Sequence, residues 1–252
     1  MSPLSGPLLS PMADAAARTA AAGTARLLAA WSMGSPLPEA ADRRCEGVAD
    51  LATRRARVSQ SLFFTDGATA DLTGRRDADP GTRDLPGHSE MIYDGANAYV
   101  RVGGSWTGFF LADPSGPRGP NDPLWPLDAL FGASGDAVEI GSEAVRGVPA
   151  TRYRVTVDLA RADAALPAGV SVPSGPYRSL RALPAQVWLD AAGLARRISV
   201  NSEPASADSV WSIVELWDFG VAADITPPGP DELLAPAEAF RLAEEESSER
   251  EI

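Results

Sequence analysis

Short apolar runs that alternate with turn residues fill most of the chain from residue 24 onward. Asp94-Gly95 and Gly103-Gly104 each lie between two such runs, and Gly147 lies in a later turn of the same kind. Glycine in a turn tolerates the positive φ angles that tight β-hairpins require. Runs that recur about every 8–12 residues are typical of one curved antiparallel sheet or barrel. The sequence therefore predicts a mainly antiparallel β fold in a single domain.

One helix is predicted before this pattern begins. Residues 12–22 are Ala-rich, with Asp14 in the first turn and Gly23 just past the end. These features are typical of a helix with an acidic start and a glycine stop. The helix is expected to lead into a meander of strands rich in β-branched and aromatic residues. The first strands are predicted in the runs 24–33, 44–53 and 54–64.

A short second helix is predicted over residues 124–131, LWPLDALF. Asn121 or Asp122 can cap its N-terminus, and Pro123 suits a first turn. A Pro/Gly-rich stretch before it and the segment Gly132 to Gly135 after it predict that this helix can move away from the sheet. Its large apolar residues recur at helical spacing. They are Leu124, Leu127, Leu130 and Phe131.

Alternation with period two is clearest in the strand predicted after Gly147. The apolar positions expected to face the interior are Tyr153, Val155, Val157 and Leu159. The polar positions expected to face solvent are Arg154, Thr156 and Asp158. Residues 160–183 then predict a short helical or irregular crossover. A further hairpin follows in LPAQVWLDAAGLARRISV, with its turn at Asp190 to Gly193.

The last long predicted strand, SVWSIVELWDFG, is apolar on both faces and is therefore expected to be buried on both. One face carries Trp211, Ile213, Trp217 and Phe219. The other carries Val210, Val214 and Leu216. The simplest interpretation of such large apolar residues is that they are core residues. The functional interpretation is that a curved sheet and two helices enclose a cavity.

Charge excludes some partners. The chain has 34 acidic and 22 basic residues, a formal net charge of -12, which repels nucleic acid and anionic lipid head groups. We expect no nucleic-acid partner, and contact with a membrane that is at most indirect. The predicted organisation is a disordered segment 1–11, a single β domain 12–230, and an acidic tail 231–252 that is partly helical or disordered.

The first residues do not have the pattern of an export signal. Residues 1–12 contain no basic residue, and Pro3, Pro7 and Pro11 interrupt the few leucines. No run approaches the roughly 18–20 apolar residues of a membrane span. The sequence as written predicts a cytoplasmic protein. A true start further upstream would instead permit an extracytoplasmic, membrane-anchored one.

No residue pattern points to catalysis or to a metal. Gly87 to Met91 begins like the G-x-S-x-G nucleophile elbow, but it ends in Met and precedes a predicted strand instead of a helix. Cys45 and His88 are the only cysteine and histidine, and their spacing offers no metal cage. Without lysine, the chain has no Walker-type phosphate loop. We expect no catalytic residue, no metal and no cofactor.

Four stretches resemble a known family of carriers. In chain order they are AGTARLLAAW, YDGANAYVRVGGSWTGFF, LPAQVWLDAAGLARRISV and ELWDFGVAADITPP. They are similar to the LolA-like carriers, and especially to the actinobacterial LppX and LprG type lipoproteins. The resemblance implies an α+β, mainly antiparallel fold, with a curved half-barrel sheet covered by a few helices. It also implies binding of acylated lipids or lipoprotein chains in an apolar cavity, without catalysis.

The sequence departs from those lipoproteins at its cysteine. A lipobox cysteine follows an apolar segment, whereas Cys45 follows Asp42-Arg43-Arg44 and lies in a predicted strand. We therefore expect Cys45 to carry no lipid and to be chemically quiet.

We expect a binding site between the second helix and the sheet, with the two phenylalanines before the helix as part of its wall. The predicted ligand-binding residues are Phe109, Phe110, Leu124, Trp125, Leu127, Leu130, Phe131, Val155, Val157, Val187 and Leu189. The leading hypothesis is a non-catalytic module for a hydrophobic ligand such as a lipid, an acyl chain or a lipoprotein. The alternative is a protein-interaction or structural module with a filled core and no ligand.

Overall fold

A computed structural model describes residues 10–40, 43–62, 89–95, 97–102, 104–110, 122–166, 182–201, 209–235, 238 and 241–242 of the 252-residue chain. The helices are α1 (Pro11–Ala21), α2 (Trp125–Ala129) and α3 (Leu159–Ala165), and the short 3-10 turns are η1 (Pro38–Ala40), η2 (Leu130–Gly132) and η4 (Pro230–Glu232). The strands are β1 (Thr24–Met33), β2 (Arg43–Asp50), β3 (Arg55–Leu62), β4 (Ser89–Asp94), β5 (Asn97–Val102), β6 (Ser105–Phe110), β7 (Val138–Val145), β8 (Val148–Val157), β9 (Leu183–Leu189), β10 (Ala195–Asn201), β11 (Val210–Trp217) and β12 (Leu233–Leu234).

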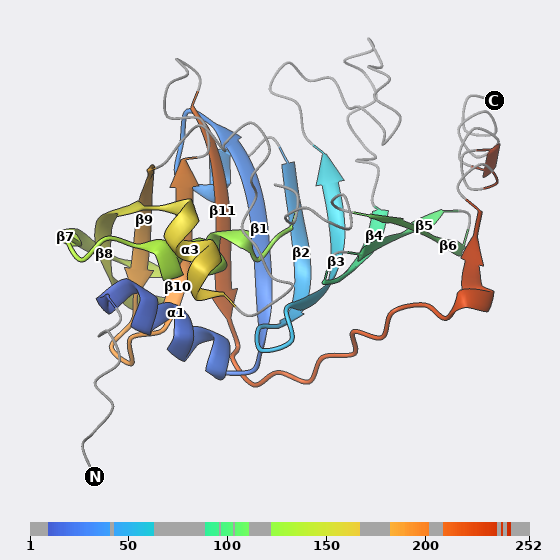
Figure 1. Ribbon diagram of the computed structural model, residues 1–252, viewed down its shortest axis with the longest axis horizontal. Helices are drawn as coiled ribbons and strands as arrows, with labels where there is room; N and C mark the ends of the chain where they lie inside the picture. The colour runs from blue at the N-terminus through green and yellow to red at the C-terminus, as the bar shows by residue number, and fades with distance from the viewer. Residues whose placement is uncertain are drawn as a thin grey trace.

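The strands of the described residues form one 12-stranded sheet in the order β12-β6-β5-β4-β3-β2-β1-β11-β10-β9-β8-β7 (Figure 1). Neighbouring strands pair antiparallel, except that β12 pairs parallel with β6. β7 and β12 stand at the two ends of this order, so the sheet is open. The antiparallel sheet predicted from the turn spacing is confirmed.

The sheet curves, and its helices lie on one side of it (Figure 1). We call this side the inner face and the opposite side the outer face. α1 contacts β10, α2 contacts β10 and β11, and η2 contacts β8. The main hydrophobic core lies between these helices and the sheet. This arrangement confirms the expected half-barrel covered by a few helices.

The predicted turns and the first helix lie where the sequence placed them. Gly95 and Gly104 adopt positive φ angles of 62° and 79° in the turns after β4 and β5. An L-residue with a side chain rarely adopts such angles, which explains the glycines. At the start of α1, the Ser10 hydroxyl accepts a hydrogen bond from the Ala13 N–H at 3.2 Å. This serine supplies the N-cap that a helix needs for its first unpaired amides.

The second helix is shorter than predicted and begins later. Asp122 Oδ1 accepts from the Leu124 N–H at 2.9 Å, which is the kind of bond predicted for a cap, but it closes the turn before α2 and not the helix itself. Leu124 holds the N-cap position and makes no side-chain bond to the helix. Pro126 lies in the first turn in place of Pro123, where its missing N–H costs no helical hydrogen bond. Asn121, the other predicted cap, lies outside the described residues.

The register predicted for β8 is confirmed. Val155 and Val157 are buried in the inner core, and Tyr153 is half-buried against it. Arg154 and Thr156, between them, are exposed. Successive side chains of a strand point to opposite faces, so the period of two in the sequence was sufficient to give this register.

The end of β8 differs from the prediction. The strand stops at Val157, so Asp158 and Leu159 do not continue the alternation. Asp158 is the N-cap of α3, and its Oδ1 accepts from the amides of Ala160 and Arg161 at 2.9 and 3.1 Å. Leu159 is still buried, but as the first residue of a helix. An aspartate after a strand can be either the next polar residue of that strand or the N-cap of a following helix. The alternating pattern does not distinguish these two possibilities.

The apolar residues of β11 are divided between both faces, as predicted. Val214 and Leu216 belong to the inner core, whereas Ile213 is buried on the outer face. Its partners in that outer cluster are Leu28, Ala30, Trp211 and Trp217. Phe219 packs on the inner core and not with the outer cluster, which corrects the prediction. Asp218 has a positive φ of 48°, so the chain turns after β11 and the alternation ends there.

After β11 the chain runs extended below the sheet to β12 (Figure 1). It is tied to β1 at the start, where the Thr24 hydroxyl donates to the Val221 carbonyl at 2.5 Å and the Gly220 N–H donates to the Thr24 carbonyl at 2.7 Å. At its far end, Leu233 and Leu234 pair with β6. This strand lies within the segment 231–252 that the sequence assigned to a tail. Two leucines are too few to show a period, so the sequence did not reveal it.

Cys45 is buried within β2, as its place in a predicted strand suggested. That its thiol carries no lipid stays a prediction, which an intact mass of the native protein checks. Among the helices of the described residues, none is long and apolar enough to cross a membrane.

Candidate functional site

The predicted site residues converge on the inner face from three separate segments. Four buried residues come from α2, its N-cap and η2, and three come from β8 and β9. They are Leu124, Trp125, Leu127, Leu130, Val155, Val157 and Val187, all members of the inner core. Phe131 and Leu189 are half-buried and pack against the same core. The tertiary fold thus places the predicted helix face and the predicted sheet face in one apolar cluster.

The strands beneath α2 also contribute residues that the sequence analysis did not select. α2 contacts β10 and β11, and the core includes the inward side chains of those strands. They are Ile198, Val200, Val214 and Leu216. Their alternation is visible in the sequence. Which strand lies under a given helix depends on strand order, which the sequence did not provide.

Phe109 and Phe110 lie in β6, far from the other site residues in the strand order. Seven strands, from β5 to β10, separate β6 from β9 in that order. The backbones of these two residues pair with Ala98 and Asn97 of β5. Their side chains lie outside the part of the chain that the structure describes. The strand order gives no support for a wall shared by these phenylalanines and α2, and we leave them out of the site.

A buried ion pair fixes α2 to the turn between β2 and β3. Arg54 Nε lies 2.8 Å from Asp128 Oδ1, and the two side chains are only 11% and 2% exposed. Taking two charges out of water is costly, so such a pair persists only with close geometry. Arg54 adopts a positive φ of 56°, an uncommon conformation for a residue with a side chain. Sequence reasoning missed this pair because 74 residues separate its members.

Asp50 builds the turn that presents Arg54. Its Oδ1 accepts hydrogen bonds from the amides of Ala52 and Thr53, each at 3.0 Å. Partial burial raises the pKa of Asp50, but these bonds, with Thr53 as the main donor, outweigh burial and hold the pKa below its ordinary value. The carboxylate is therefore ionised at neutral pH and keeps the turn closed.

The segment after α2 is pinned, contrary to the hinge predicted for Gly132 to Gly135. The Gly132 carbonyl accepts from the Asp158 N–H at 3.0 Å, and the Ser134 N–H donates to the Thr156 carbonyl at 2.8 Å. A Cβ on Gly132 would lie 2.0 Å from the Asp158 carbonyl oxygen. This glycine serves close packing of η2 on the start of α3, not flexibility.

One polar atom inside this apolar cluster has no hydrogen-bond partner among the described residues. It is the indole Nε1 of Trp125, in the first turn of α2. The whole side chain is 2% exposed. The indole N–H is a donor and cannot accept, so it needs an oxygen or another acceptor nearby.

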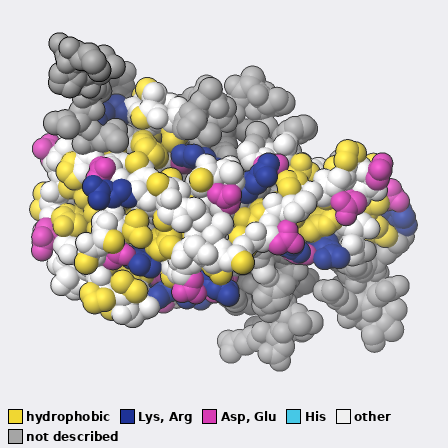
Figure 2. Space-filling view, turned by 90° about the horizontal axis from the view of Figure 1, so that it is seen from below, with side chains coloured by type: hydrophobic (Ala, Val, Ile, Leu, Met, Phe, Trp, Pro, Cys, Tyr) yellow, Lys and Arg dark blue, Asp and Glu magenta, His cyan; other side chains and the backbone are white. Residues whose placement is uncertain are grey.

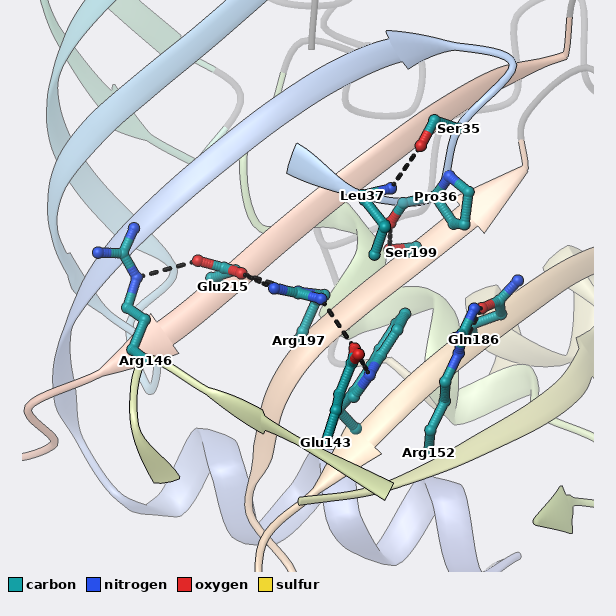
Figure 3. A network of polar contacts seen from close by, with 11 residues as sticks. Ser35, Pro36, Leu37, Glu143, Arg146, Arg152, Gln186, Arg197, Ser199 and Glu215 are labelled. Atoms are coloured by element: carbon teal, nitrogen blue, oxygen red, sulfur yellow. Dashed lines mark hydrogen bonds and ion pairs between the residues drawn. The ribbon is translucent and has the colours of Figure 1, made fainter. Parts of the chain in front are cut away.

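The outer face over β9 to β11 is organised differently, by a chain of paired charges (Figure 3). Glu215 accepts from Arg146 at 2.9 Å and from Arg197 at 2.7 Å, and Arg197 also bonds Glu143 at 3.1 Å. The Trp188 indole N–H donates to Glu143 at 2.5 Å. Arg146 comes from the β7–β8 turn, so this network fastens that hairpin over the outer face.

A second outer-face network lies on β3, β4 and β5. Glu90 accepts from Arg57 at 2.7 Å and from Arg101 at 3.0 Å. Partial burial raises the pKa of Glu90, but the two guanidinium groups outweigh burial and hold the pKa below its ordinary value.

Seen from below, the surface carries basic and acidic side chains interspersed with hydrophobic ones (Figure 2). The net charge of the chain is therefore not gathered in one patch on this view.

The catalytic and metal candidates gain no support. Gly87 and His88 lie outside the described residues, and Ser89 is the first residue of β4, where a nucleophile elbow requires a helix to follow. Within the described residues, no cluster of His, Cys, Asp or Glu could hold a metal ion. The inner face offers mainly apolar contact, and among its described polar groups the Trp125 indole N–H is a buried donor without a hydrogen-bond partner.

Comparison with known proteins bears on the fold. No family model and no curated protein matches the sequence. The crystal structure of LprF from Mycobacterium bovis superposes with a TM-score of 0.52 at 14% identity, over 87% of this chain and 95% of LprF. The Mycobacterium tuberculosis lipoprotein LppX gives a TM-score of 0.46 at 12% identity, over 85% of this chain and 98% of LppX. A LolA superfamily protein from Nitrosomonas europaea gives 0.31 at 10% identity, over 90% of this chain and 97% of that protein.

The likeness to LprF shows the fold of this chain. It spans most of both proteins, so it concerns the whole sheet and its helices and not one hairpin. The fold expected from four stretches of sequence, a curved antiparallel sheet covered by a few helices, is thereby confirmed. At 14% identity the likeness extends to the fold alone.

Proposed function

We propose that this chain, which has the fold of LprF, is a non-catalytic module that holds a hydrophobic ligand between α2 and the inner face of the sheet. The observation that carries the proposal is the convergence of the helix face and the β8–β9 face in one apolar cluster. The family resemblance in the sequence supports a lipid, an acyl chain or a lipoprotein chain as the occupant. The proposal applies equally to the cytoplasmic and the extracytoplasmic location.

Apolar contact is sufficient to drive such binding. Burial of apolar surface contributes about 25 cal/mol per Å². An acyl chain that buries a few hundred Å² thus gains several kcal/mol, enough for micromolar affinity after the costs of association. Because Asp128 and the η2 segment are pinned, we expect entry to involve a local rearrangement at the first turn of α2 and not a swing of the whole helix.

Mass spectrometry of a solvent extract from the purified full-length protein tests the proposal directly. We expect lipids that co-purify in a fixed ratio to protein and that bind again after delipidation. An extract without lipid, together with no binding of an environment-sensitive acyl methyl ester, would contradict the proposal.

Leu127→Ala locates the site. If α2 covers a ligand site, the variant weakens binding of the acyl probe. A filled core predicts that the free energy of unfolding falls by about 2–5 kcal/mol, and a ligand site predicts a smaller loss. Ile213→Ala, on the outer face, is the matched control, since it truncates a side chain that is 1% exposed without touching the inner cluster. We expect it to lose stability and keep probe binding. If both variants bind the acyl probe with equal affinity, the ligand does not bind under α2.

A protein-interaction module is the second candidate, and one observation favours it. β7 is an edge strand whose Val138 and Ile140 are 51% and 39% exposed. Edge strands with exposed apolar residues can accept a strand from a partner. The register of β7 shifts between Glu139 and Gly141, which interrupts regular pairing at that edge. A lipid-free protein that nevertheless forms complexes through β7 would favour this candidate.

A further inference from the structure

The indole N–H groups of two fully buried tryptophans differ in whether they have a hydrogen-bond acceptor. Trp188, on the outer face, donates to Glu143 at 2.5 Å. Trp125, on the inner face, has a buried Nε1 with no hydrogen-bond partner among the described residues. Buried tryptophans usually find an acceptor, because an unsatisfied buried donor loses its bond to water without replacement. A phenylalanine at position 125 would lack that donor, although its smaller ring would fill less of the core.

The surroundings of Trp125 restrict what the missing acceptor can be. The core residues nearest to it in the chain are apolar, namely Leu124, Leu127 and Leu130. An isolated buried water needs two to four polar partners, and an apolar cluster does not supply them. Asp128, one helical turn further on, bonds Arg54 through its Oδ1, and neither of its oxygens accepts from the indole nitrogen. The acceptor that fits is therefore an oxygen on a molecule that is otherwise apolar.

The charge of that oxygen follows from the same surroundings. An ionised carboxylate inside an apolar cluster requires a cation beside it. Arg54, the cation next to α2, is already paired with Asp128 at 2.8 Å. A neutral carbonyl needs only a hydrogen bond, which one indole N–H provides.

We propose that Trp125 Nε1 donates a hydrogen bond to a neutral acyl-ester carbonyl of the bound lipid. The ligand class is then esterified acyl chains, in preference to free fatty acids and to plain hydrocarbons. This inference rests on the proposed function, because it assigns the polar contact within that same site.

The test compares the full-length protein with Trp125→Phe for three ligands of matched length, delivered from cyclodextrin. These are methyl hexadecanoate, octadecane and ionised hexadecanoate. We expect the wild type to prefer the ester, and Trp125→Phe to weaken ester binding about three- to ten-fold, the range for one net hydrogen bond, with octadecane binding unchanged. Trp211→Phe, in the half-buried outer cluster, is the matched control and leaves both affinities unchanged.

A second readout follows the proton itself. In protein labelled with ¹⁵N at the indole nitrogens, the Trp125 resonance is assigned by its loss in Trp125→Phe. Methyl hexadecanoate should move it downfield as the hydrogen bond forms, and octadecane should not.

The outcomes separate the two proposals. If the wild type binds neither the ester nor the hydrocarbon, the proposed function fails. If the wild type binds both ligands, but Trp125→Phe weakens the two affinities equally or not at all, the proposed function stands and the proposed hydrogen bond from Trp125 is overturned. An indole resonance that the ester leaves unmoved likewise overturns the proposed hydrogen bond, since the Trp125 N–H then does not donate to the ester carbonyl.

Discussion

The two faces of the sheet differ in how their buried side chains are stabilised, by paired charges on the outer face and by apolar contact on the inner face. On the outer face over β9 to β11, the acidic and basic side chains pair with one another, and Glu215 at the centre has two arginine partners. Trp188 is fully buried there between the guanidinium groups of Arg152 and Arg197, 4.9 and 5.0 Å from its ring centre. The inner face is almost wholly apolar, with one ion pair at its margin and one indole donor unmatched.

The difference concerns the network over β9 to β11 and the inner apolar layer, since elsewhere on the outer face Arg44 Nε of β2 is also buried without a hydrogen-bond partner among the described residues. A polar network with every member satisfied stabilises one arrangement of the chain and leaves nothing for a ligand to add. An apolar layer with an unmatched donor has both the surface and the polar contact that an amphipathic ligand can use. This difference supports the proposal that a ligand binds at the inner face, whereas the outer network serves to stabilise the fold.

The largest effect should come from the ion pair that fixes α2. Asp128→Ala leaves Arg54, which is 11% exposed, without its carboxylate, and removing one member of a buried pair typically costs about 3–5 kcal/mol. We expect a loss of that order in the free energy of unfolding by urea.

The control for this change is Asp14→Ala, which breaks an exposed pair between Asp14 and Arg18 within α1. An exposed pair of this spacing contributes about 0.3–0.5 kcal/mol. Equal losses from the two variants would show that α2 is not held by its ion pair, and the inner face would then be held by apolar contact alone.

A smaller effect is expected on the outer face from Glu215→Ala. Arg197 keeps its bond to Glu143 at 3.1 Å and its contact with Trp188, so its charge stays partly compensated. We expect a loss of about 1–3 kcal/mol, the cost of a buried group left partly unsatisfied. Binding of the acyl probe should be unchanged, as measured by fluorescence titration. A loss of probe binding with unchanged stability would break the division of roles between the faces.

The smallest effect concerns acid stability and Glu90. Its pKa is below the ordinary 4.5 in the folded state, where burial is outweighed by the bonds from Arg57 and Arg101. A carboxylate with a lowered folded pKa stabilises the protein above its ordinary pKa, and this contribution is lost as the pH falls through the folded value.

Glu90→Gln should therefore lower stability at neutral pH by at most about 1 kcal/mol, since this network is partly exposed, and should flatten the decline of stability below pH 4.5. Thermal unfolding between neutral pH and pH 3 measures this. A variant curve that runs parallel to the wild type throughout would exclude the contribution of Glu90.

How much of the site was visible in the sequence can be judged residue by residue. Val155 and Val157 were predicted to be interior because a strand alternates with period two, and a local period needs no knowledge of the rest of the chain. Leu127 and Leu130 were recognised by helical spacing for the same reason. Gly132 was misread as a hinge, because a glycine required for close packing and one required for flexibility look identical in a sequence.

By itself, the sequence determined most of the strands, the first helix and the inward face of β8, since turn residues and side-chain periods act over a few neighbouring positions. Only the tertiary structure decided which faces meet. It placed α2 over β10 and β11, set Arg54 against Asp128, and left the Trp125 indole without an acceptor among the described residues. These contacts join segments that lie far apart in the chain, and their formation depends on strand order and sheet curvature. No local pattern records that order, because the free energy of packing belongs to the whole fold.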